Sequence, residues 1–116
     1  MIQRFGGNAR YHNVVEWNGL LFAAGQTFAE GQTIEEQAAG TLDKIEKLLE
    51  AYGSDKRHIL SACVYLRDMS TFAQFNKIYD AWVVPEYQST RTCVEAKMAT
   101  DKIMVEITII AAKKES

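Results

Sequence analysis

Two charged residues, Arg91 and Glu106, interrupt the most apolar stretches near the C-terminal end of the chain. Arg91 lies in STRTCVEAKM (89–98) and Glu106 lies in IMVEITIIAAKK (103–114), and both stretches alternate as half-buried strands do. A guanidinium can bind a carboxylate through two parallel hydrogen bonds, and a glutamate can hold or deprotonate a water molecule. The pair therefore suggests a site where water attacks a small organic acid. A cross-strand ion pair of little energetic value is the alternative.

The expected register favours the site over the ion pair. We expect the two stretches to form an antiparallel hairpin, in which a four-residue loop places Arg91 opposite Ile110 and Glu106 opposite Glu95. The two charged residues are then about four residues apart along the strands, or ~13 Å between backbones. An arginine side chain does not comfortably close that gap, so space remains for a small ligand and a water molecule.

The same register divides the two strands into an apolar face and a mixed face. The apolar face suits packing against helices and consists of Val94, Ala96, Met98, Ile103, Val105, Ile107 and Ile109. The mixed face carries Arg91, Cys93, Glu95, Met104, Glu106, Thr108 and Ile110. A strand expected at 60–67 splits in the same way, with Ser61, Cys63, Tyr65 and Arg67 on its mixed side. Because this face is too polar for a core and too apolar for open water, we expect a partner subunit to cover it.

Local signals predict a hairpin and a helix in the first half of the chain. Asn18-Gly19 between two apolar runs predicts a tight hairpin, because a type I′ turn needs positive φ at both central residues. Thr33 and Glu36 form a capping box at the start of an amphipathic helix. Gly53 stands where a glycine would end that helix.

A second helix follows the strand at 60–67. Ser70 or Thr71 can cap it, and Pro85, the only proline, stops it. Its apolar side consists of Phe72, Phe75, Ile78, Tyr79, Trp82 and Val83. Two helices separated by single strands favour an α+β fold, with one mixed β-sheet and both helices packed on one face.

Length and composition indicate an ordinary globular chain. The 116 residues are expected to form one domain, 1–116, and a formal charge of −2 gives no electrostatic footprint for nucleic acid or an anionic membrane. Cys63 and Cys93 lack metal-binding or redox spacing and are expected to be thiols of a reducing compartment. The first residues, MIQRFGGNAR, contain no apolar targeting segment, and no stretch approaches the length of a membrane span. We therefore expect a cytoplasmic protein without nucleic-acid or membrane partners.

Three stretches in order carry a resemblance to a known family. They are ARYHNVVEWNGLLFAAGQ (9–26), ILSACVYLRDMSTFAQFNKIYDAWVV (59–84) and STRTCVEAKM…KIMVEITIIAA (89–112). They resemble the Rid family, the reactive intermediate deaminases also called the YjgF/YER057c family, and look most like its short YoaB-like branch. The fifteen residues from Arg91 to Glu106 match the spacing of the catalytic pair in that family.

The resemblance implies a fold, an assembly and an activity. The fold is chorismate-mutase-like and assembles as a homotrimer with clefts between subunits. The activity is hydrolysis of 2-imino acids or their enamine tautomers, such as 2-iminopropanoate and 2-iminobutanoate, to 2-oxo acids and ammonia. Such imines are released by pyridoxal-phosphate enzymes, and the deaminase itself needs no cofactor and no metal. Arg91 would bind the substrate carboxylate, and Glu106 would orient the attacking water.

Five further residues are expected to contact the ligand. Tyr11 aligns with a family tyrosine that closes the cleft, Gly25 lets the main chain approach the ligand, and Asn76 matches a family asparagine. Cys93 stands where the family uses backbone groups, and we assign its thiol no nucleophilic role. Tyr87 can supply an aromatic wall. Tyr11, Gly25, Asn76 and Tyr87 each also have an ordinary structural interpretation.

Departures from the family pattern leave alternatives open. Ser89-Thr90 stands before the arginine where many members read Pro-Ala, so pocket shape and substrate range can differ. One alternative is a trimer of the same fold that binds small carboxylates without catalysis, as a sensor or regulator. The other is a ribonuclease, for which His12 and His58 are the available histidines.

Overall fold

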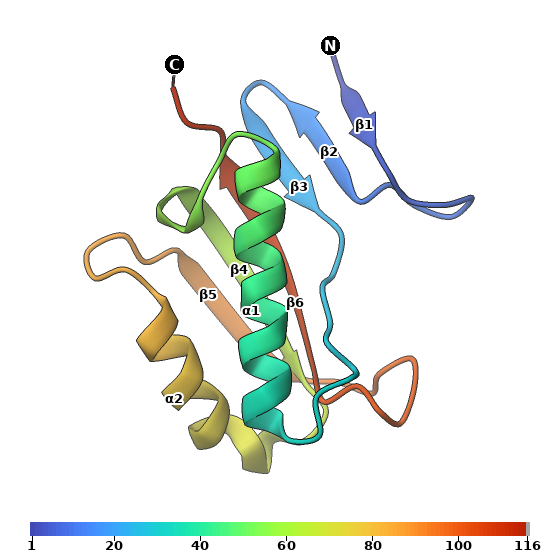
Figure 1. The fold of residues 1–116 in the computed structure, drawn as a ribbon, viewed down its shortest axis with the longest axis vertical. Helices are drawn as coiled ribbons and strands as arrows, with labels where there is room; N and C mark the ends of the chain where they lie inside the picture. The colour runs from blue at the N-terminus through green and yellow to red at the C-terminus, as the bar shows by residue number, and fades with distance from the viewer. Residues whose placement is uncertain (116) are drawn as a thin grey trace.

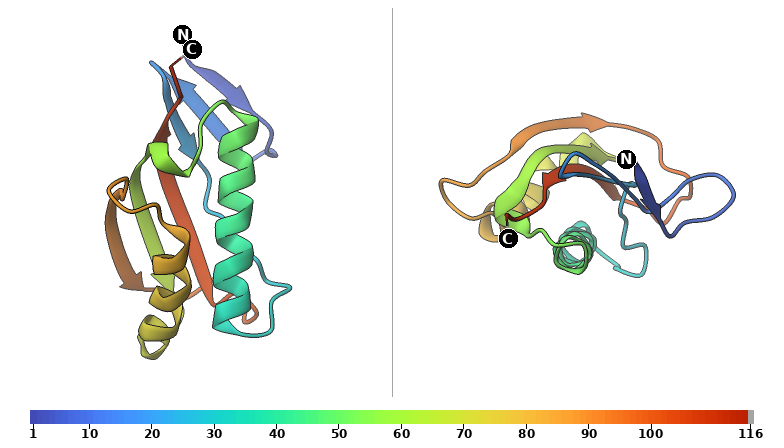
Figure 2. Two further views of the ribbon diagram at one scale, coloured as in Figure 1. Left: turned by 60° about the vertical axis from the view of Figure 1, so that its left-hand side comes forward. Right: turned by 90° about the horizontal axis from the view of Figure 1, so that it is seen from above.

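Two α-helices cover one face of a six-stranded sheet in the computed structural model, which describes residues 1–115 (Figure 1). The strands are β1 (Gln3–Phe5), β2 (Val14–Trp17), β3 (Leu20–Ala23), β4 (Ile59–Leu66), β5 (Thr90–Glu95) and β6 (Val105–Ala112). The helices are α1 (Ile34–Ala51) and α2 (Phe72–Trp82), with short 3₁₀ turns at Lys56–His58 and Met69–Thr71. The strand order is β1-β2-β3-β6-β4-β5. The expected mixed sheet with both helices on one face is confirmed (Figure 2).

The predicted hairpin and first helix are confirmed by their local chemistry. Asn18 and Gly19 join β2 to β3 with φ angles of 50° and 76°, as a type I′ turn requires. At the start of α1, the Thr33 hydroxyl accepts a hydrogen bond from the Glu36 amide at 3.1 Å. The Glu36 carboxylate in turn accepts from the amide of Gln32, one residue before the cap. Gly53, at φ +82°, ends the helix.

The second helix starts and ends where expected, although another residue caps its entry. Thr71 occupies the N-cap position but makes no side-chain capping bond, and its hydroxyl donates to the Asp68 carbonyl. The Asp68 carboxylate caps the preceding 3₁₀ turn by accepting from the Ser70 amide at 2.9 Å. The helix ends at Trp82, before Pro85.

The expected hairpin between the last two strands is wrong. The helix α2 carries the chain across the sheet from β4 to β5, and such a crossover makes the two strands parallel. β6 then returns to the middle of the sheet, antiparallel to both β3 and β4. The registers follow from this order: Arg91 pairs with Ala62 instead of Ile110, and Glu106 pairs with Tyr65 instead of Glu95.

Burial explains why β6 is central and β5 is an edge. Alternate residues of β6 are almost completely buried against the helices: Val105, Ile107, Ile109 and Ala111. Ala62, Val64 and Leu66 of β4 are buried on the same side. β5 offers no comparable stripe, and Val94 is 40% exposed. Of two candidate strands, the one with the stronger apolar stripe gains more from the central position.

The face assignment is confirmed for β4 and β6 but wrong for β5. Paired residues of neighbouring strands point to the same side of a sheet, so Arg91, Cys93 and Glu95 lie on the helix-covered side with their β4 partners. Val94 lies on the uncovered side. The uncovered side also carries half-buried residues that include Cys63, Tyr65, Glu106, Thr108 and Ile110. No helix within residues 1–115 combines the length and the apolar character needed to cross a membrane.

Candidate functional site

The Arg91 guanidinium lies against α2 at the edge of the sheet. Its Nη2 donates a 2.7 Å hydrogen bond to Oδ1 of Asn76. Three aromatic rings of the same helix lie close to its Cζ, with centroids at 4.7 Å for Tyr79, 5.6 Å for Phe75 and 5.8 Å for Phe72. Rings at such distances attract a cation and fix the plane of the guanidinium. We call these four helix residues the arginine cradle.

The arginine cradle contains no negative charge. Within residues 1–115, no carboxylate lies at ion-pair distance from Arg91. Glu95, four residues further along the same face of β5, accepts a hydrogen bond from the Met69 amide. Most of the guanidinium N–H donors therefore remain available to an anionic ligand.

Sequence reasoning assigned the cradle rings to the core and missed their contact with Arg91. The signal was present, because residues 72, 75, 76 and 79 follow the i, i+3, i+4, i+7 spacing of one helix stripe. The contact was missed because Arg91 had been assigned to the wrong face of its strand.

Cys93 is a half-buried neighbour of Arg91 on the same face of β5. Burial raises the pKa of the Cys93 thiol, and the nearby Arg91 charge only partly opposes this effect. The thiol is therefore held in its protonated form.

Glu106 lies on the uncovered face, against the backbone of the segment that follows β3. A Cβ atom at Gly25 would overlap the Glu106 carboxylate, so the glycine lets this carboxylate lie directly against the main chain. Two hydrogen bonds hold this segment to β6: the Gln26 amide donates to the Ile107 carbonyl at 2.9 Å, and the Ile107 amide donates to the Gln26 carbonyl at 3.0 Å. These bonds hold the backbone at Gly25 next to Glu106.

Arg91 and Glu106 do not meet within one chain. β4 lies between their strands, and Arg91 pairs with Ala62 while Glu106 pairs with Tyr65, three residues further along β4. Two strand spacings and three residues of rise separate the backbones by roughly 14 Å. The two side chains also point to opposite faces of the sheet. One chain therefore holds two half-sites, one with Arg91 and one with Glu106.

Tyr11 lies near the Glu106 half-site. Its side chain is 53% exposed on the loop between β1 and β2. The Asn8 side chain shapes that loop by accepting hydrogen bonds from the amides of Arg10 and Tyr11. Tyr11 and Gly25 line one cavity of about 380 Å³, together with Lys44 of α1. Gly25 therefore has Glu106 on one side and the Tyr11 cavity on the other.

Tyr87 lies away from the arginine cradle. It is 51% exposed, and its ring packs on the guanidinium of Arg57 at 5.3 Å instead of on that of Arg91. Asn76 lies beside Arg91, whose guanidinium donates a hydrogen bond to its amide oxygen. The structure thus brings Asn76 and Cys93 to Arg91, and brings Gly25 to Glu106.

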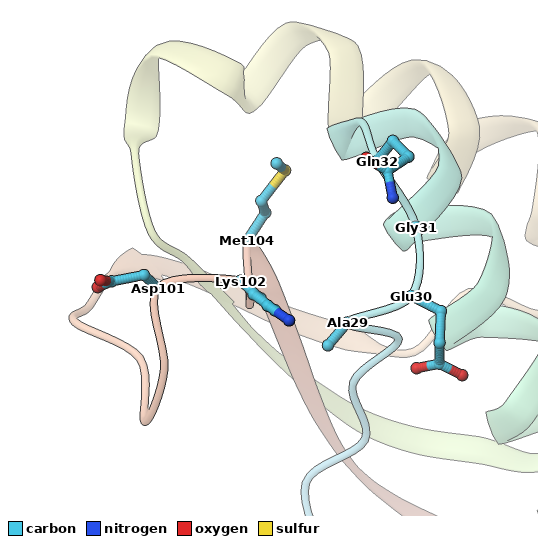
Figure 3. A pocket seen from close by; sticks show the side chains of 7 residues that line it. All are labelled: Ala29, Glu30, Gly31, Gln32, Asp101, Lys102 and Met104. Atoms are coloured by element: carbon cyan, nitrogen blue, oxygen red, sulfur yellow. The ribbon is translucent and has the colours of Figure 1, made fainter.

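A further cavity of about 310 Å³ lies between the loop before α1 and the loop before β6 (Figure 3). The buried Gln37 side chain joins the two loops: its Nε2 donates to the carbonyls of Gly31 and Lys102, and its Oε1 accepts from the Met104 amide. Met104 stands two residues before Glu106, so this clamp fixes the start of the strand that carries the glutamate. Within residues 1–115, no cluster of three His, Cys, Asp or Glu side chains has the geometry of a metal site.

Comparison with known proteins places this fold in a class of small α+β proteins. A family model described as Endoribonuclease L-PSP matches residues 1–113. The crystal structure of NMB1025 from Neisseria meningitidis, a member of the YjgF protein family, is 42% identical, with a TM-score of 0.97 and coverage of 100% of this chain and 98% of that chain. The chain belongs to the YjgF/Rid family, as the three sequence stretches indicated.

Curated relatives of similar length support the same placement. The RutC family protein YoaB of Escherichia coli K12 is 40% identical over 111 residues, which cover 96% of this chain and 97% of that protein. A RutC family protein of Haemophilus influenzae is 41% identical over 112 residues, which cover 95% of this chain and 97% of that protein.

Proposed function

We propose that the protein hydrolyses reactive 2-imino acids and their enamine tautomers, such as 2-iminopropanoate and 2-iminobutanoate, to 2-oxo acids and ammonia. The observation that carries the proposal is that the Arg91 side chain is held in place but its charge has no carboxylate partner. Its guanidinium is oriented by the aromatic rings and by Asn76, yet no carboxylate within residues 1–115 neutralises it. A planar cation held in this way is suited to grip the carboxylate of a small acid.

The proposed active site requires two subunits. Arg91 and Glu106 lie on opposite faces of the sheet of one chain, so a ligand that touches both must lie between chains. The uncovered sheet face carries Phe22 (39% exposed) and Val94 (40% exposed) beside half-buried side chains, and apolar surface of this kind favours association. We propose a homotrimer in which each cleft takes the Arg91 half-site from one subunit and the Glu106 half-site from its neighbour.

The proposed reaction needs only these groups and water. Arg91 holds the carboxylate, which fixes the C=N bond in the cleft. Glu106 takes a proton from a water molecule as the water oxygen bonds to the carbon of the protonated imine, and the C=N π electrons move to nitrogen to give a neutral carbinolamine. Glu106 then returns the proton to nitrogen, the C–N bond breaks with its electron pair leaving on ammonia, and the hydroxyl proton passes to the Glu106 carboxylate and from there to solvent as the carbonyl forms. The products are the 2-oxo acid and ammonia.

The remaining residues have supporting roles in this proposal. Gly25 and the backbone at Cys93 let the two main chains approach the ligand, and Tyr11 borders the cleft. Asn76 positions Arg91 through its hydrogen bond and is not assigned a direct substrate contact. Tyr87 forms at most an outer wall of the cleft, because its ring packs on the guanidinium of Arg57.

The test is ammonia release from freshly generated 2-iminopropanoate. Arg91→Ala should abolish catalysed release, and Glu106→Gln should slow release while 2-oxo acid binding persists. Arg4→Ala, which removes an exposed arginine from β1, is the matched control and should behave as wild type. Equal turnover of wild type and Arg91→Ala would remove the deaminase proposal. Binding without turnover in the wild type would instead favour the non-catalytic carboxylate-binding trimer.

The description of the family model as an endoribonuclease makes RNA cleavage the second candidate. The Nδ1 atom of His58 lies 2.6 Å from a carboxylate oxygen of Asp55. His58 also lines a cavity together with Lys113, whose backbone amide donates a hydrogen bond to the Gly19 carbonyl in the hairpin turn. His12 precedes β2, at the other end of that hairpin, so the two histidines do not form one acid–base pair within a chain. A salt titration of RNA binding separates the cases, because phosphate contacts give a steep loss of affinity with salt.

A further inference from the structure

Tyr65 of β4 is the cross-strand partner of Glu106. The two residues face each other in the antiparallel register of β4 and β6. Their neighbours Val64, Leu66, Val105 and Ile107 are buried against the helices. Tyr65 and Glu106 therefore both point to the uncovered face, where directly opposed side chains have Cβ atoms about 5 Å apart. Neither the sequence reasoning nor the family resemblance gives Tyr65 a role.

The carboxylate of Glu106 is confined between Tyr65 and the backbone at Gly25. On the Gly25 side there is no space even for a methyl group. On the other side stands the half-buried phenol ring. A water molecule that binds the carboxylate from the uncovered face consequently lies next to Tyr65.

The length of the tyrosine side chain suits contact with such a water. Tyrosine is the longer side chain, so from paired positions on opposite strands its phenol oxygen can reach past the glutamate carboxylate. The phenol oxygen is then level with a water that rests on the carboxylate. A hydrogen bond with the neighbouring Cys63 thiol is the main cause that raises the pKa of Tyr65, followed by burial and, more weakly, the Glu106 charge, so the phenol keeps its proton.

We propose that Tyr65 positions the water that Glu106 activates. The inference rests on the proposed deaminase function and extends it. The water donates one hydrogen to the Glu106 carboxylate and the other to the Tyr65 oxygen, which directs a lone pair toward the imine carbon. In the attack step only the proton on the Glu106 side is transferred; the phenol stays protonated throughout, and the atoms of the reaction are those already described.

The substitution that tests this role is Tyr65→Phe, which keeps the ring and removes only the hydroxyl. Ammonia release should show kcat lowered about tenfold with KM unchanged, because the substrate carboxylate is held by Arg91 of another half-site. The dissociation constant for 2-oxobutanoate should also be unchanged. Thr108→Val is the matched control, since it removes a hydroxyl from the same face of β6, opposite Cys63, and should leave both quantities as in wild type.

A crystal structure with bound 2-oxobutanoate tests the inference independently of turnover. The wild type should contain an ordered water within hydrogen-bond distance of both the Tyr65 oxygen and the Glu106 carboxylate, and Tyr65→Phe should lose it while the ligand stays on Arg91. A wild-type cleft without this water overturns the role of Tyr65 even where the enzyme is active. A kcat of Tyr65→Phe within about twofold of wild type also overturns the role of Tyr65. If the wild type binds the acid and the bridging water but releases no ammonia, the deaminase proposal fails and the positioning role of Tyr65 stands.

Discussion

Arg91 and Glu106 lie on opposite faces of one sheet, with β4 between their strands. The arginine is held by Asn76 and the rings of α2, and the glutamate lies against the backbone at Gly25. Neither side chain can cross the sheet to reach the other. Any chemistry that uses both must therefore combine the half-sites of different chains.

This arrangement predicts that an inactive variant and a slow variant restore activity when they share a trimer. The Glu106→Gln subunit still supplies Arg91, and the Arg91→Ala subunit still supplies Glu106. A cleft is complete when it takes its arginine from the first and its glutamate from the second. Every trimer that contains both variants has about one complete cleft in three, so ammonia release from isolated mixed assemblies should recover to about one third of wild type. Co-expression with two affinity tags, followed by isolation of mixed assemblies, provides the measurement.

The control for this experiment pairs Arg91→Ala with the double variant Arg91→Ala/Glu106→Gln. No subunit then supplies the arginine, so the mixed assembly should remain inactive. Activity in isolated mixed assemblies no higher than in either parent would contradict a site shared between chains.

Local features of this fold could be predicted from sequence because their causes are local. The Asn18-Gly19 turn depends on two adjacent residues, and the start of α1 depends on Thr33 and Glu36. The alternation of Val105 and Ile107 with polar neighbours likewise identified the buried face of β6. Each of these signals lies within a few residues of the structure that it determines.

The order of the last strands could not be read in the same way. Two alternating stretches joined by a short loop are compatible with a hairpin, and nothing within 89–114 shows that β4 separates them. The decision depends on the crossover through α2 and on competition for the sheet centre, which β6 wins through its deeper burial. The face of Arg91 followed that error, because its side depends on pairing with Ala62. The residue types of the site could be predicted, but not their division between two faces.

The hydrogen bond between Asn76 and Arg91 predicts a positioning role for the asparagine. Asn76→Leu keeps the size of the side chain but removes the acceptor at 2.7 Å from Nη2. Loss of a hydrogen bond to a charged, partly exposed group costs about 1 kcal/mol, so 2-oxobutanoate should bind roughly fivefold more weakly. Isothermal titration calorimetry measures the change. Gln74→Leu, an exposed position of the same helix, should bind as wild type.

A direct substrate contact would give a different pattern for Asn76. If the asparagine bound the imine nitrogen or the 2-oxo group, Asn76→Leu would lose turnover of the imine but retain affinity for simple carboxylates such as propanoate. Equal weakening of 2-oxobutanoate and propanoate is expected from a residue that acts through Arg91, and unequal weakening would contradict that role.

The close approach of Gly25 to the Glu106 carboxylate predicts what a single methyl group added beside the proposed base would do. Its φ is outside the left-handed region, so Gly25→Ala introduces no backbone strain and acts through space alone. The new Cβ would overlap the Glu106 carboxylate, which must rotate away. We expect kcat for ammonia release to fall at least about tenfold, with 2-oxobutanoate still bound by Arg91 of the neighbouring half-site. Ala24→Ser, which adds one atom at the preceding residue, is the control and should retain turnover. Full activity of Gly25→Ala would show that the carboxylate position enforced by this glycine is not the one that the reaction uses.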